Sequence, residues 1–314
     1  MFHASLRGGP ATEIIKNTMT TNDAVARKPT LDVAATWKYF AQVSGKAAYG
    51  NKADFNALER VFLAFKNLGY DTRDTVVLIG GTNKGQSSVN ILQRCPNITL
   101  YGFEIQPDMA QQAKQALHPY AGATVINMGW SDQKAQGLSI GGRGEAAGLF
   151  DPQGQRGWKV QQDVTASTVR LDEWVQRNNV KRVAYTLIDT EGHEPSVIRG
   201  MALEQTYNQQ RFPMFQYELG GTWAARDHRH NNDAWDQVIT ARHLEEAGYR
   251  LFLLGTNNWL AVTADFFVPD DNNPAINNER FGPFVQGNVL ALHSKYAPKD
   301  VASTILNLAV VFET

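Results

Sequence analysis

Short apolar runs alternate with amphipathic helical segments along most of this 314-residue chain, and this alternation restricts the fold more than any other feature. The runs lie at 75–79, 98–105, 123–128, 183–189, 212–219 and 249–254, and turn residues bound most of them. Strands that alternate with helices are typical of a mainly parallel sheet with helices on both faces. We therefore predict a doubly wound α/β fold.

Three further segments have recognisable patterns. Residues 132–157 contain seven glycines, which predicts an excursion from the sheet. A helix is expected over 233–247, with Trp235, Val238, Ile239 and Leu244 on one apolar face and Gly248 as its stop. The apolar run at 305–312 is expected to be an edge strand or a docking segment.

The N-terminal part of the chain differs from the rest. Residues 1–30 are polar without a sustained period and predict a loose arm. From 31 to 68 apolar residues recur at three- and four-residue spacings, which predicts a helical cap. We therefore expect an arm and cap over 1–68 and the α/β domain over 69–314.

Composition narrows the classes of partner and compartment. The 30 Lys and Arg nearly balance the 31 Asp and Glu without long runs of either sign, which argues against a nucleic-acid partner. No apolar stretch reaches the roughly 18 residues that a membrane span needs. Cys95 is the only cysteine, so it forms no internal disulfide, and we expect a buried apolar thiol in a cytoplasmic protein.

A glycine-rich turn follows the first predicted strand, and a carboxylate follows the second. In IGGTNKGQSS, glycines allow the backbone to approach a ligand closely before a helix begins. Glu104 lies about 20 residues further on, at a strand end where a carboxylate can bind ribose hydroxyls. A P-loop requires Gly-Lys-Ser/Thr, whereas here Lys84 precedes Gly85. A short-chain dehydrogenase is also disfavoured, since no Tyr has a Lys four residues later.

Several blocks in order resemble the FkbM family of methyltransferases from about residue 75 to 293. They are IGGTNKGQSS, YGFEIQP, GWSD and, most specifically, VRLDEW followed by LIDTEGHEPSVIRGM. The resemblance implies a class I, Rossmann-like methyltransferase with a seven-stranded sheet and S-adenosyl-L-methionine as cofactor. It also favours 288–293 over 259–262 as the seventh strand.

The resemblance implies a role for each matched position. The methionine part of the cofactor would lie against Gly81, Thr82, Asn83 and Gly85, its ribose against Glu104, and its adenine near Ser131 and Asp132. Two positions depart from the family pattern: Ile79 stands where Asp is usual, and Thr186 where Lys is usual. Losing that carboxylate leaves open how the cofactor's amino group is held.

The acceptor side is predicted at the ends of the fourth and fifth strands, where Asp189, Glu191, His193 and Glu218 offer groups that can orient a hydroxyl or take its proton. Asp189 and Glu218 could also hold Mg²⁺ if their strands are neighbours. The leading hypothesis is O-methylation of a sugar, glycan or other small hydroxylated metabolite, the sugar being implied by the resemblance alone. The alternatives are a catalytically weak or inactive nucleotide-binding scaffold with this fold and, less favoured, a nicotinamide-dependent enzyme.

Overall fold

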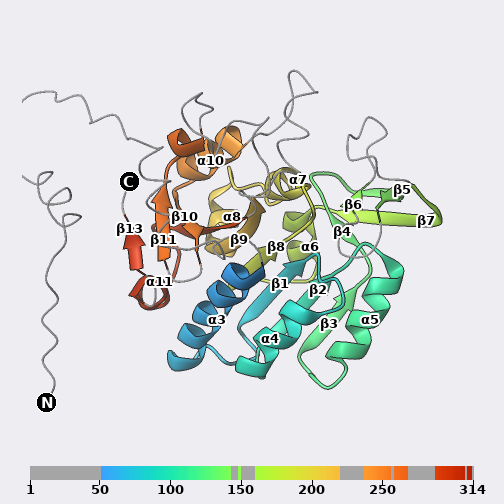
Figure 1. Ribbon diagram of the computed structural model, residues 1–314, viewed down its shortest axis with the longest axis horizontal. Coiled ribbons are helices and arrows are strands. Elements are labelled where there is room, and N and C mark those ends of the chain that lie inside the picture. Colours follow the sequence, from blue (N-terminus) through green and yellow to red (C-terminus); the bar gives the residue numbers. More distant parts are fainter. Residues whose placement is uncertain are drawn as a thin grey trace, which may run out of the picture. The chain divides into compact units, whose positions relative to one another are not determined.

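A computed structural model of the chain describes residues 51–142, 148–149, 160–219, 237–255, 258–267, 287–307 and 310–312. These residues lie within one compact unit, Val33–Thr314. A nine-stranded sheet runs through it in the order β13-β11-β10-β12-β9-β8-β1-β2-β3 (Figure 1). The central strands β3, β2, β1, β8 and β9 are parallel, while β12 runs antiparallel between β9 and β10.

The strands of this sheet follow the predicted apolar runs closely. In chain order they are β1 Val76–Gly80, β2 Thr99–Phe103, β3 Ala123–Ile126, β8 Tyr185–Ile188, β9 Met214–Leu219, β10 Tyr249–Leu254, β11 Asn258–Val262, β12 Gly287–His293 and β13 Val310–Phe312. The strand order reverses between β1 and β8, because the chain builds outward from β1 to β3 and then returns to the other side. In open α/β sheets, ligands bind at such a reversal, beyond the carboxyl ends of the strands.

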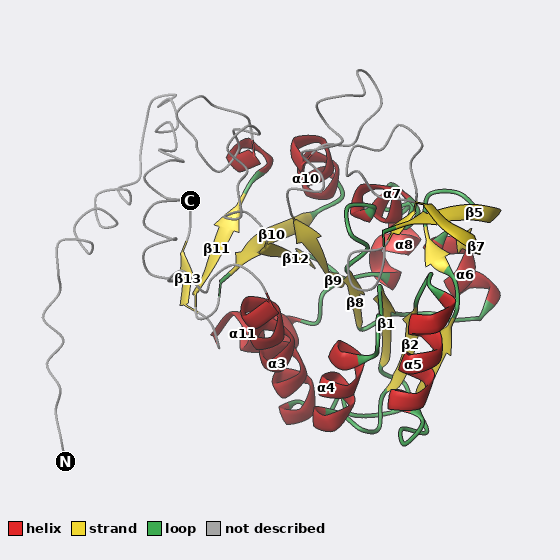
Figure 2. Cartoon of the chain, turned by 45° about the vertical axis from the view of Figure 1, so that its right-hand side comes forward, coloured by secondary structure: helices red, strands yellow, loops and turns green. Residues whose placement is uncertain are grey.

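Helices cover both faces of the sheet, and side chains alternate between two apolar clusters. One face packs against α3 Asn51–Asn67, α4 Gln86–Arg94 and α11 Lys299–Asn307, which lie on the same side of the sheet in Figure 2. The other face packs against α6 Leu171–Arg177, α7 Glu194–Arg199, α10 Gln237–Glu246 and the 3-10 helix η2 Ala264–Phe267. The remaining described helices are α5 Pro107–Leu117 and α8 Thr206–Arg211. In β8, Tyr185 and Leu187 face the first cluster and Ile188 the second.

A small second sheet occupies the glycine-rich excursion. Its strands are β4 Gly129–Trp130, β5 Ala135–Gly141, β6 Gly148–Leu149 and β7 Val160–Val169, in the order β4-β7-β5-β6. Figure 1 shows β5 and β7 side by side, and their antiparallel register contains irregularities between Ala135 and Leu138 and between Ser139 and Gly141. Within the predicted excursion, 132–157, the described residues form β5 and β6, and β4 and β7 on either side of it complete this separate sheet.

The doubly wound prediction is confirmed, with differences in detail. The large sheet has nine described strands instead of seven, because both candidate runs for the seventh strand are strands and β13 adds an edge. The preferred run forms β12, next to β9. The run at 305–312 divides, since Ile305 belongs to α11 and only Val310–Phe312 is the edge strand.

The predicted face of the helix before Gly248 is partly wrong. Ile239 is 46% exposed, whereas Thr240, Ala241 and Leu244 are buried. Helix α10 packs against β10 and η2 through a face that differs from the predicted one and contains the small residues Thr240 and Ala241. Small side chains let the helix lie close to these elements. Gly248 has φ +91° and ends the helix as predicted. Trp235 lies outside the described residues.

The predicted cap is described in part. Leu58, Val61, Phe62 and Phe65 of α3 are all buried in the apolar cluster that β1 and β8 share. Residues 1–50 lie outside the description, so the boundary at residue 68 stays a prediction. Within the described residues, no helix combines the length and hydropathy that crossing a membrane requires.

Candidate active site

A cavity of about 550 Å³ opens at the edge where β1, β8 and β9 end. This volume lies in the range of roughly 300–1,000 Å³ that small-molecule sites occupy. Its lining comes from the glycine-rich turn, the end of β2, the loop after β8 and the start of β12. Leu58 of α3 also lines it, so this helix takes part in the site as well as in the core.

The glycine-rich turn is held tightly against the loop that follows β8. Gly81 has φ +81°, and a Cβ atom there would lie 1.6 Å from the backbone oxygen of Asp189. The Asp189 amide in turn donates to the oxygen of Gly80 over 2.9 Å. The amides of Gly81 and Thr82 both donate to Phe103 oxygen. Only glycine fits at position 81, and its backbone brings the turn and Asp189 together.

Glu104 lies in the cavity wall with its carboxylate fixed by backbone donors. Its side chain is 4% exposed, Oε2 accepts from the Asn83 amide over 2.8 Å, and Oε1 accepts from the Gln106 amide over 2.9 Å. Burial raises the pKa of Glu104, and the hydrogen bonds from Gln106 and Asn83 oppose that rise. Each oxygen keeps acceptor capacity for a ligand, because a carboxylate oxygen has more than one lone pair.

Trp130 forms another part of the wall. It packs on Gly80, where a Cβ atom would lie 2.3 Å from the indole ring, and on Phe103 at a centroid distance of 5.0 Å. Its Nε1 is buried and has no hydrogen-bond partner among the described residues. The Trp130 ring thus closes the cavity wall beside Gly80.

Ser131 and Asp132 follow Trp130 but are not among the residues that line the cavity. The Ser131 hydroxyl donates to Asp132 Oδ1 over 3.2 Å and lies 3.0 Å from Nε2 of His193. Asp132 Oδ2 also accepts from Arg199 over 2.8 Å. These contacts tie the chain after β4 to His193, which precedes α7, and to Arg199 at the end of α7. The predicted contact of both residues with adenine stays a prediction.

The loop after β8 is shaped by a buried carboxylate. Glu194 is fully buried, and its Oε1 accepts from the Thr190 amide, the Thr190 hydroxyl and the Gly192 amide over 2.7, 3.0 and 3.1 Å. Within this loop, Glu191 and Gly192 have positive φ angles of +56° and +92°. Glu194 therefore holds a strained loop, and this loop places Glu191 and His193 at the cavity.

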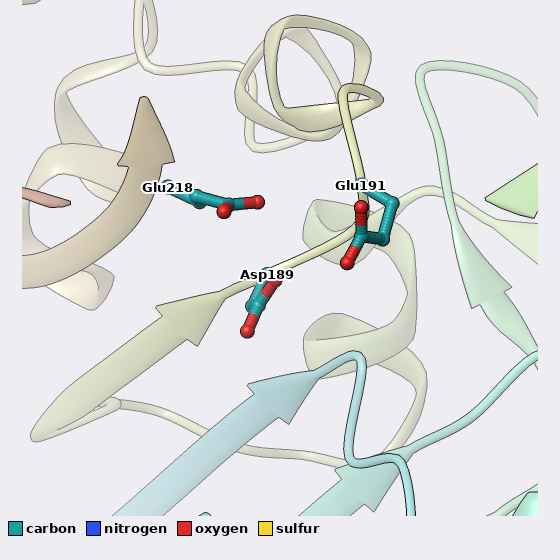
Figure 3. Close-up of side chains that lie close together, drawn as sticks. All are labelled: Asp189, Glu191 and Glu218. Carbon is teal, nitrogen blue, oxygen red and sulfur yellow. The ribbon is translucent and has the colours of Figure 1, made fainter. Parts of the chain in front are cut away.

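Three carboxylates lie close together, from Asp189 and Glu191 of this loop and from Glu218 of β9 (Figure 3). One oxygen from each of Asp189, Glu191 and Glu218 lies within 4.8 Å of the others. The group exists because β8 and β9 are parallel neighbours that end at the same edge. Like charges this close repel one another, so the group favours uptake of a proton or of a cation. Hard oxygen ligands of this kind suit Mg²⁺.

The structure brings most of the predicted site residues into one cavity. Those that line it are Gly81, Thr82, Asn83 and Glu104 on the predicted cofactor side and Asp189, Glu191, His193 and Glu218 on the predicted acceptor side. Gly85 does not line it; it precedes α4 with φ +91° and lies close to α5, where a Cβ atom would meet Ala113 at 3.4 Å.

The cavity also has lining residues that were not predicted from the sequence, among them Trp130, Gln216 and Asn288. Gln216 and Asn288 carry a signal that could have found them, because each is a polar residue inside an apolar strand. The sequence around Trp130 does not distinguish it from a core residue, because a tryptophan is an apolar aromatic residue that usually packs in a core.

The chain matches several solved structures at low identity. A precorrin-6y C5,15-methyltransferase from Geobacter metallireducens GS-15 is 11% identical, with 74% of this chain and 85% of that chain covered and a TM-score of 0.35. A fibrillarin from Aeropyrum pernix with natively bound S-adenosyl-L-methionine is 10% identical, covering 71% and 68%, with a TM-score of 0.35. A cofactor-bound protein from MTB is 13% identical, covering 91% and 98%, with a TM-score of 0.38. None of the curated proteins compared with the chain matches it.

The family model of the methyltransferase FkbM domain matches residues 80–251. This match begins in the glycine-rich turn, includes the loop after β8 and ends in β10, so it spans more than half of the chain. The chain therefore belongs to the FkbM family of methyltransferases, which use S-adenosyl-L-methionine as methyl donor.

Proposed function

We propose that this chain is an O-methyltransferase that acts on a hydroxyl of a sugar, glycan or other small hydroxylated metabolite. The observation that carries the proposal is the group of Asp189, Glu191 and Glu218 carboxylates at the cavity edge, beside the glycine-rich turn. A hydroxyl must lose its proton when its oxygen is methylated, and carboxylates placed together provide an acceptor for that proton.

The residues that line the predicted cofactor side of the cavity fit S-adenosyl-L-methionine. S-adenosyl-L-methionine supplies an electrophilic methyl group on a sulfonium sulfur. Glu104 offers carboxylate oxygens for ribose hydroxyls, and the glycine-rich turn lines the same cavity. We assign Gly81, Thr82 and Asn83 to the methionine part and Glu104 to the ribose, as the family resemblance implies.

Asp189 is our candidate for the base. It follows β8 directly, and its backbone contacts both Gly80 and Gly81. A carboxylate there is placed between the glycine-rich turn and Glu218. It can orient the acceptor hydroxyl and take its proton while the oxygen forms its bond to the methyl carbon. His193 and Glu218 are the next candidates.

The test is Asp189→Asn, which keeps the side-chain shape but removes the base. Positioned general-base catalysis contributes about 100- to 10,000-fold in rate, so turnover should fall by that order while the S-adenosyl-L-methionine dissociation constant stays within about twofold. Asp108→Asn, which removes an exposed carboxylate from α5, is the control. Turnover preserved at saturation with weaker cofactor binding would instead make Asp189 a cofactor ligand. Turnover that EDTA abolishes and Mg²⁺ restores would assign the three carboxylates to a metal.

One observation favours the alternative function, a scaffold that has lost activity. Ile79 is fully buried in the apolar cluster with Leu92 and Tyr185, so no carboxylate is available at the position where the family usually has one. A thermal-shift panel with S-adenosyl-L-methionine, S-adenosylhomocysteine, NAD and ATP separates the functions, since a ligand at 100 times its dissociation constant stabilises by about 2.7 kcal/mol. No shift with any of them would favour the scaffold, and a shift with NAD alone would favour a nicotinamide enzyme.

A further inference from the structure

A chain of polar side chains joins the segment after β4 to the histidine of the cavity wall. Nε2 of His193 lies 3.0 Å from the Ser131 hydroxyl, and that hydroxyl lies 3.2 Å from Oδ1 of Asp132. The other oxygen of Asp132 accepts from Nε of Arg199 over 2.8 Å. His193 lines the cavity, whereas the other three residues are not among those that line it. The chain therefore reaches the cavity through His193.

Backbone contacts fix Ser131 and Asp132 in place. The Ser131 amide donates to Val169 oxygen over 3.1 Å, which continues the pairing of β4 with β7. A Cβ atom at Gly200 would lie 2.2 Å from the Ser131 oxygen, so glycine at the end of α7 lets this helix approach the segment. Nη1 of Arg170 donates to Asp132 oxygen over 3.1 Å. Both residues are thus anchored to the second sheet and to α7.

The hydrogens of this chain can be placed in only one way that satisfies every contact. A serine hydroxyl has a single hydrogen, an ionised carboxylate only accepts, and a guanidinium only donates. Asp132 must therefore receive the hydrogen of Ser131, and Ser131 must in turn accept from Nε2 of His193. The chain requires the tautomer of His193 that carries its hydrogen on Nε2.

The backbone of His193 is held as well as its ring. His193 directly precedes α7, and the Val197 amide of that helix donates to its oxygen over 3.1 Å. The next residue, Glu194, is the buried carboxylate that accepts from the Thr190 and Gly192 amides. In proteins, the hydrogen bond at one ring nitrogen of a histidine sets the state of the other nitrogen. The bond to Ser131 can therefore set both the orientation and the tautomer of this imidazole.

We propose that Ser131, Asp132 and Arg199 are positioning residues that hold the His193 ring in its Nε2–H tautomer at the cavity wall. A neutral histidine that donates through one nitrogen can accept only at the other, so the chain decides which nitrogen of His193 can serve the reaction. This role differs from the adenine contact that the family resemblance implies for Ser131 and Asp132. Its part in catalysis rests on the proposed function, in which His193 is a candidate base, whereas the tautomer follows from the contacts alone.

The tautomer can be measured by long-range proton–nitrogen NMR on protein whose histidines are isotope-labelled. The spectra are recorded at about pH 9, where a histidine with the ordinary pKa of about 6.5 is neutral. His193→Gln identifies the signals of this ring by their disappearance. Wild type should carry the hydrogen on Nε2, and the hydrogen bond to Ser131 should slow the exchange of that N–H group with water.

Asp132→Asn should invert the tautomer. Because Arg199 only donates, the new amide must turn its oxygen to Arg199 and its NH₂ group to Ser131. The Ser131 hydroxyl then accepts from that NH₂ group and donates its own hydrogen to Nε2 of His193, so the ring carries its hydrogen on Nδ1. A wrong tautomer also results when asparagine replaces the aspartate beside a catalytic histidine.

Two further variants complete the experiment. Ser131→Ala breaks the chain, so the slowly exchanging Nε2–H signal of His193 should be lost, and this variant tests the proposal even if Asp132→Asn does not fold. The matched control is Asp172→Asn, which removes the carboxylate of a nearby ion pair, with Arg170 at 2.9 Å, and should leave the His193 signals as in wild type. Calorimetric affinity for S-adenosylhomocysteine should stay within about twofold in all three variants.

The inversion in Asp132→Asn is the decisive result, since an unconstrained histidine also favours hydrogen on Nε2. Hydrogen on Nδ1 in wild type, or on Nε2 in folded Asp132→Asn, would overturn the proposal, as would a slowly exchanging Nε2–H signal that persists in Ser131→Ala. Weaker S-adenosylhomocysteine binding in these two variants with unchanged tautomers would overturn it in favour of adenine contacts. A wild-type protein that does not bind S-adenosylhomocysteine would remove the proposed function and leave the tautomer result standing.

Discussion

Replacing Gly81 by alanine tests the close contact between the glycine-rich turn and the loop after β8. The new Cβ atom would lie 1.6 Å from the Asp189 oxygen, and this atom belongs to backbone that cannot rotate away. Asp189 is also held from the other side by the bond from its amide to Gly80 oxygen. The turn and the loop must therefore separate before alanine can be accommodated.

The expected loss of stability has two parts. A residue with a Cβ atom at φ +81° carries backbone strain of about 1–2 kcal/mol. The steric overlap adds about 1–3 kcal/mol, as overpacking of a closely packed site does. Gly81→Ala should thus lower the free energy of unfolding by roughly 2–5 kcal/mol, out of about 5–15 kcal/mol for a typical native protein.

Gly69→Ala is the matched control, because Gly69 has φ +78° and nothing lies within 4 Å of a Cβ atom there. Urea denaturation should show only the strain part for Gly69→Ala and the larger sum for Gly81→Ala. Affinity for S-adenosylhomocysteine, measured by calorimetry, should fall at least tenfold in Gly81→Ala alone. Equal destabilisation by the two substitutions would refute the close contact.

Three further results are expected. Burial raises the pKa of Glu104 above its ordinary 4.5, so the affinity of the wild-type protein for S-adenosylhomocysteine should weaken as the pH falls, beginning above pH 4.5. Glu104→Gln should bind this ligand weakly and with little pH dependence. A wild-type affinity that does not change with pH would place the ribose elsewhere. Burial raises the pKa of Cys95 to about 11, so iodoacetamide at pH 8 should label it only after unfolding, and rapid native labelling would contradict its placement. Glu194→Leu leaves the Thr190 and Gly192 donors unpaired, so urea denaturation should show a free energy of unfolding lower by about 1–3 kcal/mol. An unchanged free energy of unfolding would mean that water replaces the carboxylate.

Features set by local sequence could be predicted. The turn at Gly81 and the carboxylate at Glu104 each follow a strand directly, so strand periodicity and turn chemistry were enough to place them at one edge. Asp189 was placed by the same reasoning. The family resemblance supplied the choice of 288–293 as the seventh strand, which periodicity alone could not make, and the structure places that strand beside β9.

Features set by register or by packing could not be predicted. The hydrogen bond between Gln216 and Asn288 depends on how β12 aligns with β9, and a shift of one residue would turn every side chain to the opposite face. Ser131 and Asp132 are placed by the second sheet and by contacts with both ends of α7, which local patterns do not show. Ile239 is exposed because α10 packs through small residues, and hydrophobicity alone favours the opposite orientation.

The antiparallel placement of β12 has a consequence for how the chain reaches its native state. Gln216 and Asn288 are 72 residues apart in sequence, whereas β1 and β2 pair across a short crossover. Contacts of high sequence separation form late, because loop closure must precede any stabilisation that they provide. During synthesis the region around Glu104 can therefore assemble first. The wall that carries Asn288 is completed only when the last quarter of the chain has emerged.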